Sequence, residues 1–192
     1  MRWSELEDQA CSLSRTLGVI GDRWTLMVLR DCFLRIRRFE DFQSRLGVSR
    51  AVLTERLDKL VENFILAKVP YQEKPIRYEY RLTPKGLDMY PIIMSMVHWG
   101  DVHMAGKKGR PVLHRHQNCG HVFDPVLVCS ECNEPVEPRA VDVLAGPGAG
   151  SPRHLPADIE LPVRRPVAVK AGVAHPQLRS PRRSASRGNR TA

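Results

Sequence analysis

The chain has 192 residues, of which 42% are hydrophobic, and it carries a formal net charge of +9. This length suffices for one ordinary domain with an additional segment, and the apolar content suffices for a core. The charge is unevenly placed, because residues 151–192 hold nine Lys and Arg against two acidic residues, whereas residues 1–150 hold 21 against 19. Attraction of an anionic partner must therefore be argued from the local placement of basic residues.

Composition and cysteine content also bear on where the protein works. No apolar run is long enough to span a membrane, and the N-terminal stretch MRWSELEDQACSL is too acidic and polar for a secretory signal. The five cysteines are an odd number, which without a signal indicates free thiols or a metal site in a reducing compartment. We therefore expect a cytoplasmic protein that has no membrane partner.

Residues 11–34 have apolar residues at helical spacing. One stripe is formed by Leu13, Leu17 and Ile20. The dipeptide Gly21-Asp22 interrupts the run, and Asp22 has the side chain of an N-cap residue for a second helix. Two consecutive helices are predicted, with one kinked helix as the alternative.

The next stretch contains two short amphipathic helices joined by a tight turn. Phe39–Leu46 forms the first of them, and Gly47 ends it as a left-handed C-cap residue would. Ser49 then caps a longer helix, whose apolar face is formed by Leu53, Leu57, Leu60, Val61 and Phe64. So short a connection is what a helix-turn-helix requires, although two such helices also occur in ordinary helical bundles.

A two-stranded ribbon follows and decides between these two interpretations. Residues 65–71 and 76–82 alternate apolar and polar residues, with residues 72–75 as the tip. Pro70 and Pro75 suit edge strands or a turn, and a lone hairpin of this size must pack on the helices to be stable. Two helices, a tight turn and a ribbon in this order predict a winged helix-turn-helix, a mainly α fold with a small β wing.

The last predicted helix runs from Pro84 to about Met104, with Thr83 as its N-cap and a kink at Pro91. Its apolar residues extend beyond one stripe, and the additional ones are Ile92, Ile93, Met96 and Trp99. A helix that is apolar on more than one side needs a second partner, and a second copy of the chain is the simplest candidate. We expect a homodimer held through the first helix and this one.

Composition divides the chain into three parts. Residues 1–106 contain the predicted winged helix and the dimerisation surface, and residues 107–150 form an appendage that contains Cys and His. In residues 151–192, Pro, Arg, Ala and Ser dominate without sustained periodicity. This basic tail is therefore predicted to be disordered.

The appendage carries a candidate zinc site, whose expected ligands are Cys119, His121, Cys129 and Cys132. The last two cysteines are separated by two residues, a gap that lets two thiolates share one tetrahedral Zn²⁺. Two other histidines compete for the histidine position, namely His114 and His116. Asn133 stands where glycine usually follows such a pair, and asparagine tolerates the left-handed conformation. The alternative is a set of free thiols in a poorly ordered arm.

Five segments in this order carry a resemblance to a known family. They are Cys11, LGVIGDRWTLMVLRD, RRFEDFQSRLGVSRAVLTERLDKLVENFIL, PYQEKPIRYEYRLTPKG and HWGD. Together they resemble the HxlR-type winged-helix transcriptional regulators, which are related to the MarR group, over about residues 8–104. The resemblance implies a bacterial homodimer that binds double-stranded operator DNA at the nucleoid, and we expect a repressor. It also implies tuning in some members by thiol oxidation or by a small-molecule effector.

In such a fold the second helix of the pair enters the major groove with its N-terminal end first. Candidate contacts to base edges or flanking phosphates there are Ser49, Arg50 and Thr54. Arg50 has the side chain suited to a bidentate contact with guanine, and Lys59, further along, is expected to reach phosphate. Contacts to the DNA backbone are also expected from four basic residues before the helices and on the wing, namely Arg37, Arg38, Lys74 and Arg77.

Cys11 is the candidate redox residue. It lies at the start of the first helix, where a helix dipole lowers the pKa of a thiol. The resemblance implies the same role, because redox-sensing members of the family use a cysteine at this place. An inert, packed cysteine is the alternative, and this is what we expect of Cys32 in its apolar run.

Two other classes of function compete with DNA-binding regulation. A thiol or zinc hydrolase would need a positioned base and nucleophile, but the sequence holds no phosphate-binding glycine loop, nucleophile elbow or paired His-Glu motif. We therefore expect no enzyme. A zinc- or thiol-dependent protein-interaction adaptor without specific DNA reading is the remaining alternative. The salt dependence of binding to duplex DNA separates it from a regulator.

Overall fold

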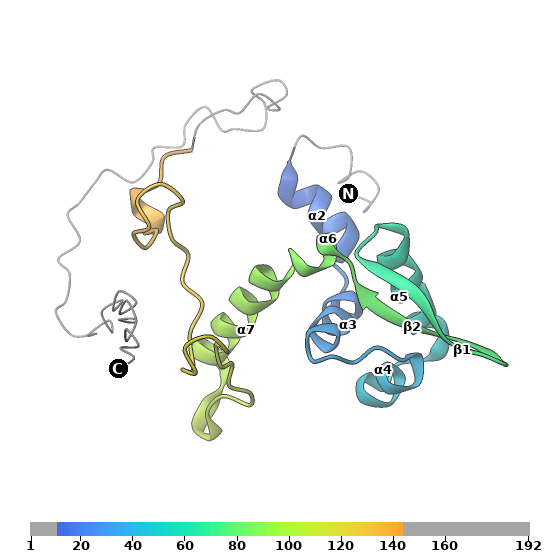
Figure 1. The fold of residues 1–192 in the computed structure, drawn as a ribbon. Helices are drawn as coiled ribbons and strands as arrows, with labels where there is room; N and C mark the ends of the chain where they lie inside the picture. The colour runs from blue at the N-terminus through green and yellow to red at the C-terminus, as the bar shows by residue number, and fades with distance from the viewer. Residues whose placement is uncertain (1–10, 144–192) are drawn as a thin grey trace, which may run out of the picture. The chain divides into compact units, whose positions relative to one another are not determined.

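The computed structural model describes residues 11–143, which Figure 1 shows in colour. The elements of this part are α2 (Ser12–Ile20), α3 (Arg23–Phe33), α4 (Phe39–Leu46), α5 (Arg50–Glu62), β1 (Leu66–Glu73), β2 (Ile76–Leu82), α6 (Pro84–Leu87), α7 (Tyr90–Met104), and two short 3-10 helices, η1 (Gly106–Lys108) and η2 (Pro138–Ala140). They form the mainly helical fold with a two-stranded wing that the sequence predicts. The predicted disordered tail and the glycine-rich end of the appendage lie outside the described residues.

Helices α2 and α3 meet at Gly21 and Asp22, as the sequence predicts. The Asp22 carboxylate accepts hydrogen bonds from the backbone N–H groups of Trp24 at 2.9 Å and Thr25 at 3.2 Å. It therefore satisfies two of the donors that a helix leaves free at its N-terminus. Two separate helices are confirmed, and the single kinked helix is excluded.

The core lies mainly between α3 and α5, with contributions from α4 and β1. The largest fully buried apolar side chains are Val28, Leu29, Phe42, Leu53, Leu57, Leu60 and Leu66. Replacing a leucine in such a position by alanine costs about 2–5 kcal/mol, so this packing fixes which face of α5 turns inward. The opposite face of α5 is left exposed at the surface.

The turn between α4 and α5 has the geometry that its residues predict. Gly47 has φ +64° and its N–H donates to the carbonyl oxygen of Gln43 at 2.9 Å. The Ser49 hydroxyl accepts from the backbone N–H of Val52 at 3.3 Å, so it caps α5. Phe64 is a correction to the sequence analysis, because α5 ends at Glu62. Phe64 follows with φ +57° and a side chain that is 74% exposed, so it turns the chain toward β1 and packs no core face.

Strands β1 and β2 pair antiparallel from Leu66↔Leu82 to Glu73↔Ile76, with an irregularity between Pro70 and Gln72 in β1.

 The pairing shifts there by one residue, and β1 continues past Tyr71, so the tip is shorter than the sequence suggests. The chain before α4 also pairs with β2: Arg38 forms a bridge with Glu79, and the N–H of Tyr80 donates to the carbonyl oxygen of Arg37 at 2.8 Å.

The helix expected over residues 84–104 is divided into α6 and α7, which is a second correction. Thr83 caps α6 as predicted, and its hydroxyl accepts from the N–H of Gly86 at 3.0 Å. Pro91 lies in the first turn of α7 instead of kinking a continuous helix. The physical reason is that the first turn of a helix needs no N–H donor, so proline is accommodated there without loss.

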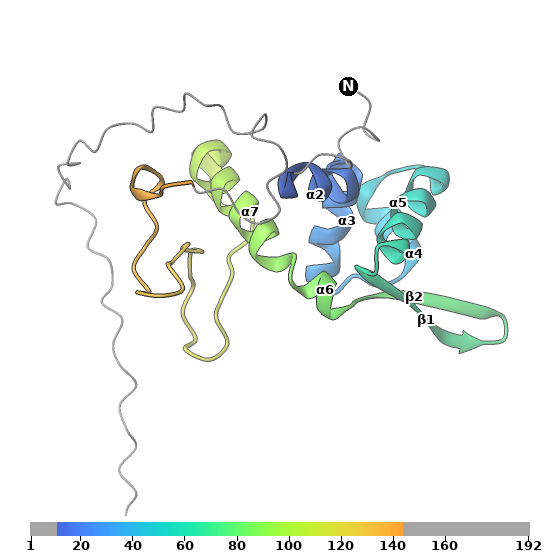
Figure 2. The ribbon, with the colours of Figure 1, turned by 90° about the horizontal axis from the view of Figure 1, so that it is seen from above.

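Helix α7 and the wing lie at opposite ends of the winged helix, as Figures 1 and 2 both show. The chain returns along α7 after η1, where the Asp124 carboxylate pairs with Arg110 and lies 3.5 Å from Nδ1 of His98. None of the helices within residues 11–143 has the length and apolar content of a membrane-spanning helix.

Candidate nucleic-acid interface

The exposed face of α5 begins with the residues that the sequence assigns to base reading. Ser49, Arg50 and Thr54 are all exposed, at or near the N-terminal turn of this helix. Asp58 and Glu62 are exposed farther along the helix. Glu55 is exposed as well, beside Thr54, but its carboxylate pairs with Arg56 Nη1 at 3.0 Å. Because phosphates repel carboxylates, the N-terminal turn of α5 is the part of this helix that best suits close approach to a nucleic acid.

The Arg50 side chain is oriented by residues of α4. Its guanidinium carbon lies 4.6 Å from the centre of the Phe39 ring, and its Nη1 donates to Oε1 of Gln43 at 3.3 Å. A guanidinium has five N–H donors in a planar fork, so most of its hydrogen-bonding capacity is still available here. Arg50 is thus held at the helix-turn-helix surface in a partly preorganised position.

Arg37 and Arg38 are placed beside the wing by the backbone pairing with β2. Both side chains are exposed, and the Arg38 guanidinium carbon lies 4.5 Å from the centre of the Tyr71 ring. The sequence analysis assigned both arginines to the DNA backbone but did not predict this pairing. Its consequence is that the two arginines and the wing form one connected surface.

The wing itself carries the two predicted basic residues and one that was missed. Lys74 lies at the tip and Arg77 follows on β2, and both are exposed. Lys68 on β1 is also exposed, with its Nζ 5.0 Å from the centre of the Tyr78 ring. The alternation of β1 could have identified Lys68, because it has the period-two spacing of an outward residue.

Lys59 does not belong to this surface, which corrects its assignment. Its Nζ donates to the carbonyl oxygen of Gly18 at 2.7 Å in a partly buried position. That carbonyl lies in the last turn of α2, where helices leave acceptors unsatisfied and favour a positive charge. Lys59 therefore connects α5 to α2, and we remove it from the proposed DNA contacts.

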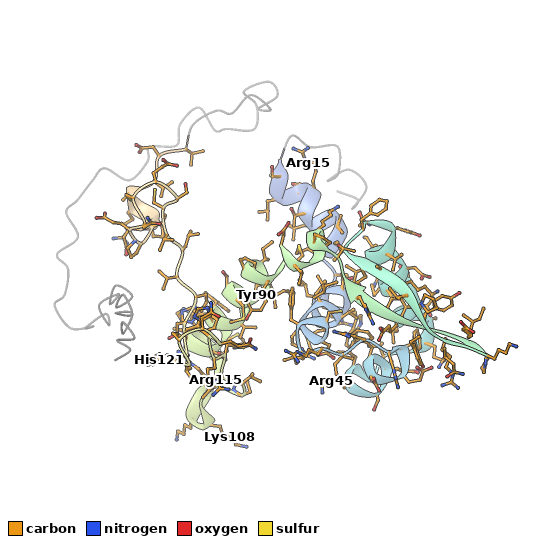
Figure 3. The ribbon with its side chains drawn as sticks, in the orientation of Figure 1. Arg15, Arg45, Tyr90, Lys108, Arg115 and His121 are labelled. Atoms are coloured by element: carbon orange, nitrogen blue, oxygen red, sulfur yellow. The ribbon has the colours of Figure 1, made fainter. Side chains whose placement is uncertain are left out.

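Asp31 in α3 holds the first helix of the helix-turn-helix in place. The sequence analysis did not identify this role. Its fully buried carboxylate accepts from Arg30 Nη2 at 2.7 Å and from Arg45 Nε at 3.2 Å. Figure 3 labels Arg45 on α4, close to α3. Because Asp31 belongs to α3 and Arg45 to α4, this carboxylate fixes the position of the first helix of the motif.

A recess of about 310 Å³ lies between the end of α3, β2 and α6. Apolar residues line part of it, including Phe33 and Leu82, and three arginines line the remainder, namely Arg35, Arg37 and Arg81. Its volume is at the lower end of the range for small-molecule sites. The recess therefore joins apolar side chains to three arginines, of which Arg81 pairs with the Glu79 carboxylate.

The two cysteines of the helical domain differ in environment. Cys11 is the N-cap residue of α2 and is half-buried, and a hydrogen bond from the backbone of Ser14 holds the pKa of its thiol below the ordinary value. Cys32 is buried in the core, and burial raises the pKa of its thiol to about 12. Of these two cysteines, only Cys11 has the properties of a reactive thiol.

The cysteines of the appendage lie on two hairpins. Nδ1 of His116 lies 3.3 Å from Sγ of Cys119 in the first hairpin. In the second, the backbone N–H of Cys132, with that of Glu131, lowers the pKa of the Cys129 thiol. No three His, Cys, Asp or Glu side chains within residues 11–143 are close enough together to hold a metal ion. The predicted zinc site stays a prediction at this point.

Comparison with known proteins decides the family of this helix-turn-helix. Residues 19–108 match the HxlR-like helix-turn-helix. A stretch of 137 residues is 41% identical to an uncharacterized HTH-type transcriptional regulator of Mycobacterium tuberculosis, covering 71% of this chain and 87% of that protein. The chain belongs to the HxlR-like helix-turn-helix family. It is a transcriptional regulator and not an enzyme.

Solved structures agree with an HxlR-like winged helix. PA1607, described as a transcription factor, has a TM-score of 0.67 and 28% identity, over 74% of this chain and 99% of that one. PA1374 from Pseudomonas aeruginosa, also described as a transcription factor, has a TM-score of 0.51 and 32% identity, over 73% of this chain and 95% of that one. The stretch shared with the mycobacterial regulator spans 71% of the 192 residues, so it reaches at least residue 135 and includes both hairpins of the appendage.

Proposed function

We propose that this HxlR-like regulator binds specific operator DNA as a homodimer and represses the genes beside it. The observation that carries the proposal is the exposed N-terminal turn of α5, where Arg50 is held ready between Phe39 and Gln43. The exposed arginines and lysines of the wing surface would contact phosphates on either side. Operator binding would place the protein at the nucleoid, in the cytoplasm of its cell.

The proposed dimer rests on apolar surface that is exposed on α2 and α7. The exposed fractions are 66% for Leu13, 40% for Ile92, 51% for Met96, 59% for Trp99 and 54% for Val102. A single chain gains no stability from leaving such side chains in water, whereas a second copy would bury them. Symmetric pairing through this surface leaves both copies of α5 free for the DNA.

A symmetric dimer also restricts the arrangement of half-sites in the operator. Two copies of α5 would enter the major groove at half-sites related by the dimer axis, about one helical turn or a multiple of it apart. We therefore expect an inverted repeat whose half-sites face the same side of the duplex. A monomer would require only one half-site and would show no such symmetry.

The test combines selection of bound sequences with a salt titration. Duplexes enriched from a random library by the full-length protein should contain an inverted repeat. Their binding, followed by fluorescence anisotropy, should weaken as salt increases, with a slope of about −0.9 for each neutralised phosphate. Equal affinity for selected and random duplexes would contradict operator reading and favour the adaptor function. Addition of the protein to a transcription reaction from such an operator should lower transcript yield.

The dimer has its own test, with a matched control. Trp99→Glu should convert the dimer to a monomer in sedimentation, because a carboxylate would be buried in an apolar surface. Phe64→Glu alters an aromatic residue that is even more exposed, at 74% against 59% for Trp99, and lies outside the proposed surface, so it should leave the dimer intact. A wild-type protein that sediments as a monomer at micromolar concentration would rule out the dimer.

We further propose that a peroxide-class oxidant tunes this regulator at Cys11. The thiolate would attack one oxygen of hydrogen peroxide, and cleavage of the O–O bond would leave a sulfenic acid on the cysteine and release hydroxide, which takes up a proton from solvent to give water. Cys11 begins α2, which carries part of the proposed dimer surface, so its oxidation would act on dimerisation. Cys11→Ser should make operator affinity insensitive to peroxide, whereas Cys32→Ala should not.

A further inference from the structure

The first hairpin of the appendage is a tight turn around Cys119. The N–H of His116 donates to the carbonyl oxygen of His121 at 2.9 Å, and the N–H of Gly120 donates to the carbonyl oxygen of His116 at 2.8 Å. Gly120 has φ +75°, and a bridge between Arg115 and Val122 closes the hairpin. Figure 3 labels Arg115 and His121 on this hairpin.

The second hairpin repeats this arrangement around Cys132. The N–H of Cys129 donates to the carbonyl oxygen of Glu134 at 2.9 Å, and the N–H of Asn133 donates to the carbonyl oxygen of Cys129 at 2.9 Å. Asn133 has φ +59°, as the sequence predicts for a residue in place of glycine. A bridge between Val128 and Pro135 closes this hairpin.

The two hairpins are therefore equivalent position by position. His116 takes the place of Cys129, and Cys119 takes the place of Cys132. Each hairpin has one metal-binding side chain at its first position and a cysteine three residues later, before the left-handed residue. A turn of this kind directs both side chains to the same side, as in zinc sites with a two-residue gap. His121, the histidine assigned from the sequence, falls instead at the position of Glu134, after the left-handed residue.

The side chains of the first hairpin already have the separation of two ligands on one metal. With bonds of about 2.3 Å to sulfur and about 2.0–2.1 Å to nitrogen, tetrahedral zinc holds the two atoms roughly 3.5 Å apart. Nδ1 of His116 lies 3.3 Å from Sγ of Cys119. The Phe123 ring meets the His116 ring edge to face at 6.3 Å between centres, which supports this orientation of the imidazole.

We propose that His116, Cys119, Cys129 and Cys132 bind one Zn²⁺ within a single chain, with two ligands from each hairpin. Three thiolates and one imidazole complete a closed tetrahedral site, which is the type that stabilises structure. Binding displaces the protons of the three thiols, so it releases up to three protons at a pH where all are protonated. The proposal is independent of whether the protein binds DNA.

The second hairpin must approach the first for the four ligands to meet, and its contacts permit this. Within the described chain, the hydrogen bonds of this hairpin are all internal to residues 127–140. Seven residues, 122–128, join the two closing bridges and reach roughly 20 Å when extended, which is ample for the two hairpins to come together. Leu127 is 74% exposed and Val126 57%, so the same movement would offer them apolar partners.

The test measures zinc bound to the full-length protein and to single variants. Protein that is reduced, supplied with zinc sulfate and passed through a desalting column should retain one zinc per chain by elemental analysis. Cobalt in its place should give the intense visible absorption of a tetrahedral thiolate site. Cys119→Ser and Cys132→Ser should each abolish retention, and Cys11→Ser should retain one zinc.

The histidine is assigned by a matched pair of variants in the same hairpin. Competition with a chromophoric chelator should show that His116→Ala weakens zinc binding more than the roughly 10–100-fold typical of losing a supporting residue. His121→Ala should bind zinc as the unaltered protein does. Circular dichroism of each variant checks that the helices are still folded. Loss of zinc in His121→Ala but not in His116→Ala would overturn the assignment. Absence of retained zinc, or one zinc per two chains, would overturn the site itself.

Discussion

The Nζ atom of Lys59 donates to the carbonyl oxygen of Gly18 at 2.7 Å, across 41 positions of the sequence. This hydrogen bond satisfies an acceptor near the C-terminus of α2 and places a positive charge at the negative end of that helix. This hydrogen bond holds α5 against α2. The contact makes Lys59 part of the scaffold that positions the recognition helix.

Lys59→Met should therefore lower stability and leave the ionic part of DNA binding intact. We expect the free energy of unfolding in urea to fall by about 1–2 kcal/mol, because the lost hydrogen bond has a charged donor. The slope of operator affinity against salt should not change. Lys74→Met is the matched control, with unchanged unfolding and a salt slope smaller in magnitude by about 0.9 for each copy of the chain in the proposed dimer. A reduced salt slope for Lys59→Met would return this lysine to the DNA surface.

Asp31→Ala should weaken the attachment of α4 to α3. The buried carboxylate loses its charge-assisted hydrogen bonds to Arg30 and Arg45, which we expect to cost roughly 2 kcal/mol of unfolding free energy. Asp88→Ala removes an exposed carboxylate and should change stability little. Thermal unfolding followed by circular dichroism measures both. If the two variants melt alike, the Asp31 carboxylate does not hold the two helices together.

Gly86→Ala should destabilise the junction between the wing and α6. A Cβ atom at Gly86 would lie 2.2 Å from the carbonyl oxygen of Ile65, so the backbone must move, at a cost of about 1–3 kcal/mol. Gly100→Ala in α7 is the control, because a Cβ there meets nothing within 4 Å. That substitution should raise stability slightly, since alanine favours the helix. A Gly86→Ala protein as stable as the control would contradict this close packing.

Features that depend on a few neighbouring residues could be predicted from the sequence. Asp22, Ser49 and Thr83 cap helices because the side chain of each reaches backbone N–H groups two or three residues ahead. Gly47 ends α4 because a left-handed residue is needed there. Such local chemistry fixes the element order and therefore the winged helix.

Features that depend on long-range packing could not be predicted. Lys59 and Thr54 look alike as polar residues on one helix, and only the position of α2 engages the lysine. The Asp31–Arg45 contact depends on how α3 and α4 pack. The pairing of Arg38 with Glu79 likewise depends on the wing folding back beside α4. The histidine of the proposed zinc site was ambiguous for the same reason, since spacing alone does not give hairpin register.

Cys11 should react with iodoacetamide at neutral pH, and Cys32 should not. The thiolate is the reactive form, and the pKa of Cys11 is lowered whereas that of Cys32 is raised to about 12. Labelling of Cys11 should increase with pH and level off as its thiol becomes ionised. Peptide mapping by mass spectrometry separates the two sites. Equal labelling of both in the folded protein would contradict the burial of Cys32.

Because the pKa of its thiol is raised, Cys32 should make the stability of the folded protein decrease at alkaline pH. Because the folded state keeps this thiol protonated, its contribution to stability is complete below the unfolded pKa of about 9 and is lost as the pH rises toward about 12. Cys32→Ala removes the titrating group, so its stability should fall less between these two pH values. Urea unfolding at neutral and alkaline pH measures the difference. A parallel loss of stability in both proteins would assign the effect to other groups.

Arg50→Ala should lower affinity for the operator more than affinity for random DNA. Arg50 projects from the first turn of α5, and Phe39 and Gln43 hold its guanidinium at the surface. A bidentate contact with guanine discriminates between bases by about 1–3 kcal/mol, whereas a phosphate contact adds affinity with little preference. Lys74→Ala on the wing should lower both affinities about equally. Fluorescence anisotropy on the two duplexes at several salt concentrations measures both variants. If Arg50→Ala reduces the two affinities alike, Arg50 contacts phosphate, and base reading belongs to Thr54 or to DNA shape.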